Sequence, residues 1–387
     1  MVKNVKDILL DDFWIMPATP EYIEVGVPYI TSKNIKNGKI DFSKVNYISQ
    51  EAYETISKNR PILVGDILIS MIGTLGETAE VTLEDGSFYG QNMFLIRLDE
   101  MVVYKRYFLN YFKSDLVKRA LEGKQNQSTQ KYLKANHIEE LQIPILPLDE
   151  QISIAETLDK IQGIISRRKD ELLKLDELIK ARFIELFGSM ESKIPISEMC
   201  NVTGGYSFKS GDISDDGAIK ILQIGNVHLD NVSWETTNYL PEGFDEKYSK
   251  FMLDEGDIVV ALTRPIIQSL GNVKACIVKS SDLPCLLNQR VGRIVAKKEK
   301  SVFLEFIYGC LMTDDFTRYV ESCSIGCSQP NISTKDIENY LIPNATYEKQ
   351  KAYVEFKKET DKSKVAVQKA LDEAQLLFDS LMQKYFG

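Results

Sequence analysis

The sequence predicts an α+β protein: two tandem α/β domains, separated and joined by two long antiparallel coiled-coil helices, in a pseudo-twofold arrangement. Three observations lead to this fold class. The 387 residues contain a diverged internal repeat. Each copy opens with short β-branched runs punctuated by Gly, Asn and Asp, which indicate strands and turns. Each copy closes with a longer run in which apolar residues recur at helical spacing.

The repeat is clearest in the second part of each copy. With an offset of 199, residues 128–188 align with residues 327–387 without a gap. Further upstream the offset is about 191, and "VGDILIS" lies over "EGDIVVA". The second copy therefore carries an insertion of several residues between Asp257 and Gln289. Two domain-sized copies indicate a duplication rather than a solenoid.

The repeat divides the chain into four segments: residues 1–146, a globular domain; 147–188, a central helix; 189–345, a second globular domain; and 346–387, a C-terminal helix. Runs such as "NMFLIRL" and "VGRIVA" predict strands in the globular parts. Short helices are expected at residues 104–122 and 304–322. Strands together with helices predict α+β domains.

The two helical segments carry an apolar stripe at 3–4–3–4 spacing, which is a heptad pattern. Because a long helix in water needs its apolar face packed, we expect the segments to pair, as an alternative to one generic core helix. The second helix starts with polar residues at the aligned positions Lys357, Thr360 and Lys364, so we expect that half to be wetter. The packing positions that the stripe predicts are Leu158, Ile161, Ile165, Leu172, Leu175, Ile179 and Leu186, then Leu371, Ala374, Phe378 and Leu381.

Composition excludes several classes of protein. The chain has no run of about 18 apolar residues and no signal-peptide pattern at its start, so we expect a cytoplasmic protein without a membrane partner. The six cysteines are scattered, and both histidines lie far from the one close pair, Cys323 and Cys327. We therefore expect no metal site and no disulfide framework. The net charge of −9 argues against nonspecific nucleic-acid binding but allows binding through a local patch.

Motifs for catalysis are missing from the sequence. There is no Asn- or Asp-Pro-Pro-aromatic tetrapeptide of amino-methyltransferases and no phosphate-binding loop of the G-x-x-x-x-G-K-[ST] type. His137 aligns with Asp336 in the second copy, so the repeat does not support a histidine acid–base site. We predict no catalytic residues and a protein that is not an enzyme.

The layout resembles the specificity subunit of type I restriction–modification systems over the whole chain. The stretches that carry the resemblance are "IPILPLDEQISIAETLDKI", "GYSFKSGDI" with "IKILQIGNV", "SMIGTLGETAEV" and "GCSQPNISTKDIENYLIP". The resemblance implies that the globular segments are target-recognition domains, each reading one half of a bipartite asymmetric site in double-stranded DNA. The helices would then set the spacing and dock two methyltransferase subunits.

The resemblance also implies further partners and their cofactors. Restriction and translocase subunits join the complex where they are present. S-adenosylmethionine, ATP and magnesium are expected on the partner subunits, and no cofactor is expected on this chain.

Direct reading of DNA needs paired donors and acceptors: Arg or Lys for guanine, and Asn or Gln for adenine. For each candidate the alternative is a solvated loop or a helix cap. Residues that read bases should differ between the two copies, whereas scaffold residues should agree. The repeated pairs Gly65-Asp66 and Gly256-Asp257 are therefore expected to form turns. The predicted DNA contacts are Lys33, Asn34, Lys124, Gln125, Asn126, Gln127, Ser128, Gln130, Lys131, Lys209, Arg264, Gln268, Gln289, Arg290, Ser324, Ser328, Gln329 and Asn331.

Two other functions fit parts of the sequence. The acidic charge favours a coiled-coil interaction scaffold that does not read DNA sequence. A methyltransferase or nuclease fused to a recognition part would need the missing motifs and a longer chain.

Overall fold

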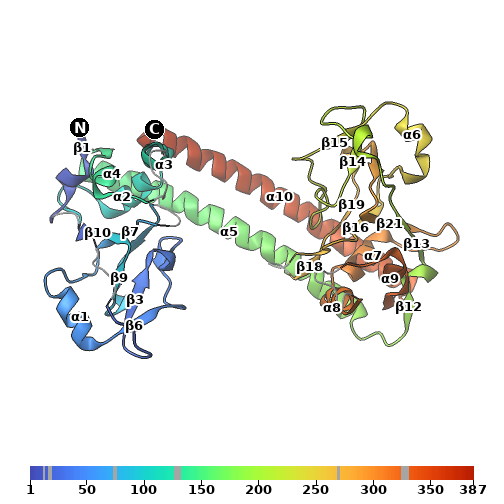
Figure 1. The fold of residues 1–387 in the computed structure, drawn as a ribbon, viewed down its shortest axis with the longest axis horizontal. Helices are drawn as coiled ribbons and strands as arrows, with labels where there is room; N and C mark the ends of the chain where they lie inside the picture. The colour runs from blue at the N-terminus through green and yellow to red at the C-terminus, as the bar shows by residue number, and fades with distance from the viewer. Residues whose placement is uncertain (12–13, 16–19, 73–75, 126–131, 268–270, 324–330) are drawn as a thin grey trace. The chain divides into compact units, whose positions relative to one another are not determined.

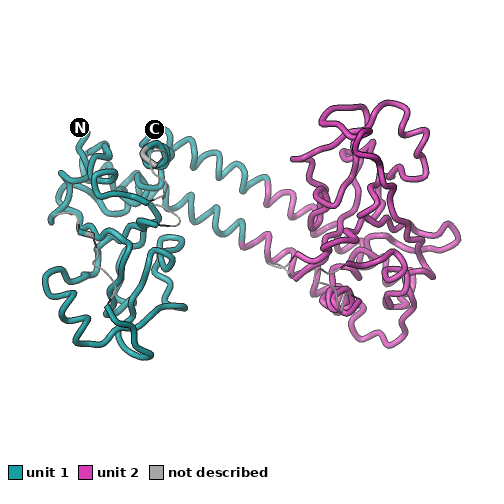
Figure 2. Tube along the Cα trace, viewed as in Figure 1, with its two compact units in different colours: residues 1–169, 369–387 teal, residues 170–368 magenta. Residues whose placement is uncertain are grey.

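The computed structural model describes residues 1–11, 14–15, 20–72, 76–125, 132–267, 271–323 and 331–387. Figure 1 shows the ribbon coloured along the chain. The chain divides into two compact units, which Figure 2 shows in different colours. Unit 1 comprises Met1–Lys169 and Lys369–Gly387, and unit 2 comprises Asp170–Gln368. Each unit holds part of both long helices, α5 (Leu148–Phe187) and α10 (Tyr347–Phe386), together with one globular lobe. The strands, short helices and long helices confirm the predicted α+β class.

The lobe of unit 1 is built around a four-stranded antiparallel sheet with the order β2-β10-β7-β8. A second sheet, β6-β3-β9, contains one parallel pair, β3 with β9. The strand bounds are β1 (Val2–Asn4), β2 (Trp14–Ile15), β3 (Val27–Thr31), β4 (Ile35–Lys36), β5 (Lys39–Ile40), β6 (Asn46–Ile48), β7 (Ile67–Ser70), β8 (Thr78–Glu80), β9 (Tyr89–Gln91), β10 (Met93–Ile96) and β11 (Gln142–Pro144). The helices are η1 (Val5–Ile8), η2 (Ser32–Asn34), α1 (Gln50–Ser57), η3 (Leu83–Asp85), α2 (Lys105–Phe112), α3 (Asp115–Gln125) and α4 (Ala135–Glu139).

The lobe of unit 2 repeats this topology. Its sheets have the orders β13-β21-β16-β19 and β15-β14-β20, and β14 pairs with β20 in parallel. The strand bounds are β12 (Lys193–Pro195), β13 (Cys200–Gly204), β14 (Ile219–Leu222), β15 (Asn238–Leu240), β16 (Ile258–Ala261), β17 (Ile266–Ile267), β18 (Asn272–Val273), β19 (Ala275–Ile277), β20 (Cys285–Leu287), β21 (Val291–Ala296) and β22 (Leu341–Pro343). The helices are η4 (Ile196–Glu198), η5 (Ser210–Asp212), α6 (Phe244–Lys247), η6 (Ser249–Phe251), η7 (Ser280–Asp282), α7 (Leu304–Leu311), α8 (Asp314–Cys323) and α9 (Thr334–Asn339).

The lobe of unit 2 contains a hairpin within the stretch where the offset between the copies changes. In unit 2 the strands β17 and β18 pair between β16 and β19. The offset between the copies rises there from 191, between β7 and β16, to 197, between β8 and β19. The predicted insertion between Asp257 and Gln289 is therefore confirmed, and it contains this hairpin.

The central sheet of each lobe is buried on both faces. In unit 1, Ile67 and Ile69 of β7 pack with Phe108 of α2, whereas Leu68 packs with Ile30 of the second sheet. A strand that is covered on both faces needs apolar residues at successive positions. This explains why the sequence shows continuous apolar runs here rather than strict alternation.

A turn with a glycine of positive φ precedes the central strand in both lobes. Gly65 has φ +93° and Gly256 has φ +92°, a region that side chains rarely adopt. The aspartates that follow, Asp66 and Asp257, are buried, with 1% and 4% exposure. The prediction that these repeated pairs form turns is confirmed.

The long helices contribute to the core of each unit. In unit 1, Leu158 of α5 lies in one apolar cluster with Met382 and Phe386 of α10. In unit 2, Phe187 of α5 shares a cluster with Tyr353 of α10. The early part of one helix thus packs with the late part of the other, as an antiparallel pair requires.

The burial of the predicted stripe differs along the helices. Ile161, Ile165 and Leu371 are buried, and Phe378 and Leu381 pack against the core of unit 1. The remaining predicted positions are partly buried: Leu172, Leu175, Ile179, Leu186 and Ala374.

The polar start of α10 is accommodated by local contacts in unit 2. Lys364 forms an ion pair with Asp176 of α5 at 2.5 Å. The hydroxyl of Thr360 donates to the carbonyl of Phe356 at 3.0 Å. The position that holds Ile165 in the first copy holds Lys364 in the second, so this half of the helix pair is more polar.

A buried glutamine ties each long helix to its lobe. Gln151 donates to the carbonyl of Leu146 at 2.8 Å, and Gln350 donates to the carbonyl of Ala345 at 2.9 Å. Each also accepts a backbone N–H from its lobe. The equivalent contacts are 199 residues apart, so this junction is part of the duplicated scaffold.

The burial of the described cysteines leads us to expect that their thiols react at different rates. Burial raises the pKa of Cys200, Cys276 and Cys285 to about 12, and Cys310 is also buried, whereas Cys323 is exposed. Because the thiolate is the nucleophile, alkylation at pH 8 is expected to be roughly a thousandfold slower at the buried thiols. Iodoacetamide labelling followed by peptide mass spectrometry checks this. Labelling of all five at one rate in native protein would contradict the buried core, and unfolding in urea provides the positive control.

Candidate nucleic-acid interface

In unit 2, loops that carry predicted DNA contacts meet at one end of the central sheet. The N–H of Leu262, directly after β16, donates to the carbonyl of Arg290, directly before β21, at 2.9 Å. The carbonyl of Leu262 accepts from the N–H of Ile332 at 2.9 Å, and Thr263 pairs with Asn331. The segment after β16 therefore lies between the β20–β21 turn and the segment that leads into α9.

Unit 1 repeats this arrangement. The N–H of Met71 donates to the carbonyl of Asn92 at 3.1 Å, and the carbonyl of Met71 accepts from the N–H of Leu133 at 3.0 Å. Ile72 pairs with Tyr132. These bonds fall on those of unit 2 when each residue is moved by the local offset of 191, 198 or 199. We call this end of each central sheet the loop edge: residues 71–72, 91–92 and 132–133 in unit 1, and 262–264, 289–290 and 331–332 in unit 2.

The structure brings several predicted contacts together at the loop edge of unit 2. The exposed ones are Arg264, Gln289, Arg290 and Asn331. Lys209 is exposed as well. It follows shortly after Tyr206 in the chain, and the carbonyl of Tyr206 accepts from the N–H of Gln289 at 3.0 Å.

In unit 1 the exposed Lys33 lies in η2. The hydroxyl of Ser32 in the same short helix donates to the carbonyl of Asn92. This bond joins η2 to the loop edge, and Lys33 is the next residue along the chain.

Other predicted contacts lie outside the described residues and stay predictions: Asn126, Gln127, Ser128, Gln130, Lys131, Gln268, Ser324, Ser328 and Gln329. Lys124 and Gln125 end helix α3, and their side chains are also outside the described part.

The prediction that Asn34 contacts DNA is wrong, because its side chain belongs to the scaffold. It is 7% exposed, and its Oδ1 accepts from the N–H of Thr31 at 2.9 Å. Its Nδ2 donates to the carbonyls of Asp41 and Lys44, at 2.8 and 3.0 Å. Asn226 makes the same bonds in unit 2, to Gln223, Ser233 and Thr236. An amide with both donors already used inside the lobe is not available to a base.

Both predicted arginines line one groove in unit 2. The groove measures about 400 Å³, opens to solvent, and is lined by Ile224, Thr263, Arg264 and Arg290. Its side chains come from the turn after β14, the loop after β16 and the β20–β21 turn. A concave surface with two guanidinium groups is suited to phosphate oxygens or to the acceptor edge of a base.

An aromatic cluster beside the loop edge was not predicted from the sequence. The Tyr206 ring lies 4.6 Å from the Tyr248 ring and 5.1 Å from the Phe208 ring, between centroids, and Tyr206 is 36% exposed. Lys247 lies 5.2 Å from the Tyr248 ring. Tyr206 is the exposed tyrosine of the cluster and Tyr248 is partly buried. Tyrosine and lysine side chains are among those that contact phosphate oxygens in protein–DNA complexes. Tyr206 and Tyr248 lie far apart in the sequence, so no sequence pattern pointed to this cluster.

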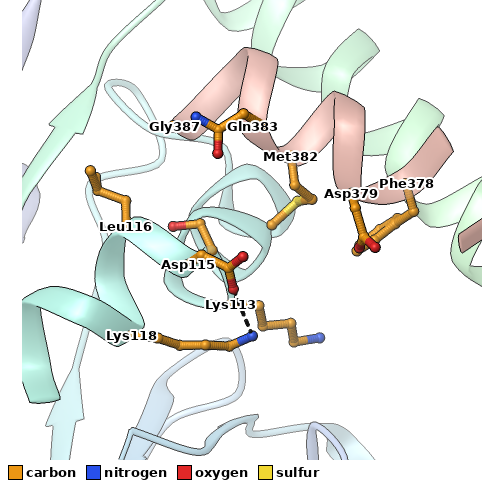
Figure 3. A pocket seen from close by; sticks show the side chains of 10 residues that line it. Lys113, Asp115, Leu116, Lys118, Phe378, Asp379, Met382, Gln383 and Gly387 are labelled. Carbon is orange, nitrogen blue, oxygen red and sulfur yellow. Dashed lines mark hydrogen bonds and ion pairs between the residues drawn. The ribbon is translucent and has the colours of Figure 1, made fainter. Parts of the chain in front are cut away.

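A second, smaller cavity lies in unit 1 at the start of α3, and Figure 3 shows it. It measures about 70 Å³ and includes Lys113 and Lys118 of the lobe and Asp379 and Met382 of α10. Lys118 forms an exposed ion pair with Asp115 at 3.2 Å, which Figure 3 marks with a dashed line. The cavity lies at the opposite end of α3 from Gln125 and holds none of the predicted contacts.

Two findings concern metals and membranes. Within the described residues, His, Cys, Asp and Glu side chains do not form a group of three or more that is placed to hold a metal ion. Among the helices in the described ranges, none combines the length and apolar character that crossing a membrane requires.

Comparison with known proteins matches both copies of the repeat. The sequence model of the family described as "Type I restriction modification DNA specificity domain" matches residues 16–175 and 190–374. The specificity subunit of the type I restriction enzyme MjaVIII from Methanocaldococcus jannaschii is 28% identical over 359 residues. That match covers 88% of this chain and 80% of the relative.

A second relative and a solved structure agree with this match. The putative type I restriction enzyme MjaX specificity subunit from the same organism is 25% identical over 390 residues, covering 91% of this chain and 84% of the relative. The S subunit of a type I restriction–modification system from M. genitalium has a TM-score of 0.57 and 15% identity. It covers 100% of this chain and 96% of that chain, and this likeness shows the fold.

Proposed function

Because this chain belongs to the family of type I restriction modification DNA specificity domains, we propose that it is the sequence-recognition subunit of a type I restriction–modification complex. Each lobe reads one half of a bipartite, asymmetric site in double-stranded DNA. The two family matches, one on each copy of the repeat, support two recognition domains in one chain.

The observation that carries this proposal is the repeated loop edge with different side chains. Its backbone bonds are the same in both units, through Met71 and Asn92 in unit 1 and through Leu262 and Arg290 in unit 2. Asn92 and Arg290 differ between the copies, and so do Ile72 and Thr263, whereas Gln91 and Gln289 are identical. A conserved frame with divergent side chains is what two readers of different half-sites need, because base contacts specify and the frame only positions them.

The long helices offer surface for the methyltransferase partners. Leu178 and Leu377 stand at equivalent positions, 199 residues apart, and are 47% and 51% exposed. The recurrence of an exposed leucine at the same place in both copies is what supports a docking role for the helices. Two equivalent positions fit two methyltransferase subunits, with restriction subunits added where they exist.

The chain itself acts in this proposal without catalysis. S-adenosylmethionine, ATP and magnesium are bound by the partner subunits, and this chain brings those subunits to the DNA site. The absence of methyltransferase and phosphate-loop motifs from the sequence supports this division of labour.

Selection from randomised DNA tests the function. The chain, assembled with its methyltransferase subunits, is expected to enrich duplexes that carry two short specified halves separated by a fixed gap. The methyltransferase subunits without this chain are the control and should enrich no motif. Binding by the full complex without any sequence enrichment would contradict the proposal and favour an interaction scaffold.

A further inference from the structure

The backbone of unit 2 holds Arg290 in a fixed position at the groove. Its carbonyl accepts from the N–H of Leu262 at 2.9 Å. The preceding residue, Gln289, donates to the carbonyl of Tyr206 at 3.0 Å. With the backbone held on both sides, only the side chain has to be ordered when a ligand binds, which favours binding.

Arg264 is held beside it in a conformation that few side chains adopt. Its φ is +48°. Its neighbours enforce this: Thr263 pairs with Asn331, and the carbonyl of Pro265 accepts from the N–H of Lys274 at 2.6 Å. Backbone conformations that the surroundings enforce against local preference occur frequently at binding sites.

Arg290 also differs from the structural arginines of the protein. Arg97 and Arg293 form ion pairs with buried carboxylates, at 2.7 and 2.6 Å. Arg290 is exposed at the groove and, within the described ranges, forms no ion pair. A planar guanidinium fork can donate two hydrogen bonds to the O6 and N7 atoms of one guanine in the major groove.

The duplicated frame shows which side chains vary between the copies. Asn92 occupies the position of Arg290, since the carbonyl of each accepts from the residue after the central strand. Ile72 occupies the position of Thr263. Gly73 aligns with Arg264 in sequence and lies outside the described part. The arginines are therefore specific to unit 2.

On the basis of the proposed function, we propose that Arg290 reads a guanine in the half-site of unit 2, with Arg264 beside it in the same groove. Asn92, at the same place in unit 1, leaves the other half-site without this requirement, because asparagine matches adenine.

The test uses the chain assembled with its methyltransferase subunits and the half-sites selected by the unchanged complex. Arg290→Ala is expected to weaken binding by about 10- to 100-fold at one G·C pair and to remove the preference there. Its binding to the other half-site should stay unchanged. Arg318→Ala is the matched control, because Arg318 is an exposed arginine of the same unit, paired with Asp315 on α8. Equal melting temperatures show that both variants are folded.

A modified base separates base reading from phosphate contact. Replacing that guanine by 7-deazaguanine removes the N7 acceptor and is expected to weaken the unchanged complex but not the Arg290→Ala complex. If Arg290→Ala instead weakens all duplexes equally, or if the modified base weakens both complexes alike, the assignment of Arg290 is wrong. If the unchanged complex selects a bipartite motif that Arg290→Ala leaves intact, this inference alone fails. If it selects no motif, the proposed function fails, and this inference fails with it.

Discussion

Replacing Phe187 with alanine is expected to lower the free energy of unfolding of unit 2 by about 3–5 kcal/mol. Phe187 is 1% exposed. Its ring lies 4.8 Å from that of Phe306 on α7 and 5.9 Å from that of Tyr353 on α10, between centroids. The substitution removes a large buried ring and leaves a cavity where both long helices meet the lobe.

Hydrogen exchange checks this expectation region by region. Protection should fall in β16 (Ile258–Ala261) and α7 (Leu304–Leu311) of unit 2 and remain in β7 (Ile67–Ser70) of unit 1. Ile184→Ala is the matched control, because Ile184 is on the same helix but 63% exposed, and it should cost less than about 0.5 kcal/mol. Unchanged protection in the Phe187→Ala variant would show that the ring cluster does not hold helix and lobe together.

The apolar stripe predicted the existence of the long helices better than it predicted their contacts. Heptad spacing selected Ile179 and Leu186, which are only partly buried. Phe183 and Phe187 are the buried residues of that region, because the lobe of unit 2 covers the neighbouring face of α5. A pattern within one helix cannot show which further element packs on it.

Comparison of the two copies predicted the buried Gly-Asp turns but not the arginines that pair with them. Agreement between copies identified Asp66 and Asp257 as scaffold. The arginines that pair with them do not align between the copies. Ile96 and Ile294 are equivalent positions, but Arg97 follows Ile96, whereas Arg293 precedes Ile294. Because side chains two apart in a strand share a face, either position reaches the carboxylate. The sequence comparison therefore could not pair them.

The candidate site was predicted only in part, because residue type alone does not show exposure. Lys33 and Asn34 are neighbours with donors suited to bases, yet the first is exposed and the second is buried. Asn92 was missed because the hairpin β17–β18 shifts the offset between copies, and this hid its equivalence to Arg290. The hydrogen bonds of the loop edge were needed to align these two positions.

Replacing Asn226 with alanine is expected to destabilise unit 2 by about 2–4 kcal/mol, and Asn34→Ala should have the same effect on unit 1. Each amide is buried and bonds one N–H and two carbonyls of its own loop, and alanine would leave these groups without partners. Urea unfolding followed by circular dichroism, with hydrogen exchange to assign the unit, measures the loss. Asn201→Ala, at an exposed position on β13, is the control and should change stability little.

DNA selection with the same variants separates scaffold from reader. If Asn34 belongs to the scaffold, a stabilising buffer that keeps the Asn34→Ala variant folded should leave its base preferences unchanged. Asn34→Asp is a sharper version, because it keeps the shape and the acceptor but removes both donors to Asp41 and Lys44. A folded, stable Asn34→Ala protein with an altered half-site would show that Asn34 reads DNA after all. The assignment of the matching Asn226 to the scaffold would then fall as well, because it rests on the same three bonds.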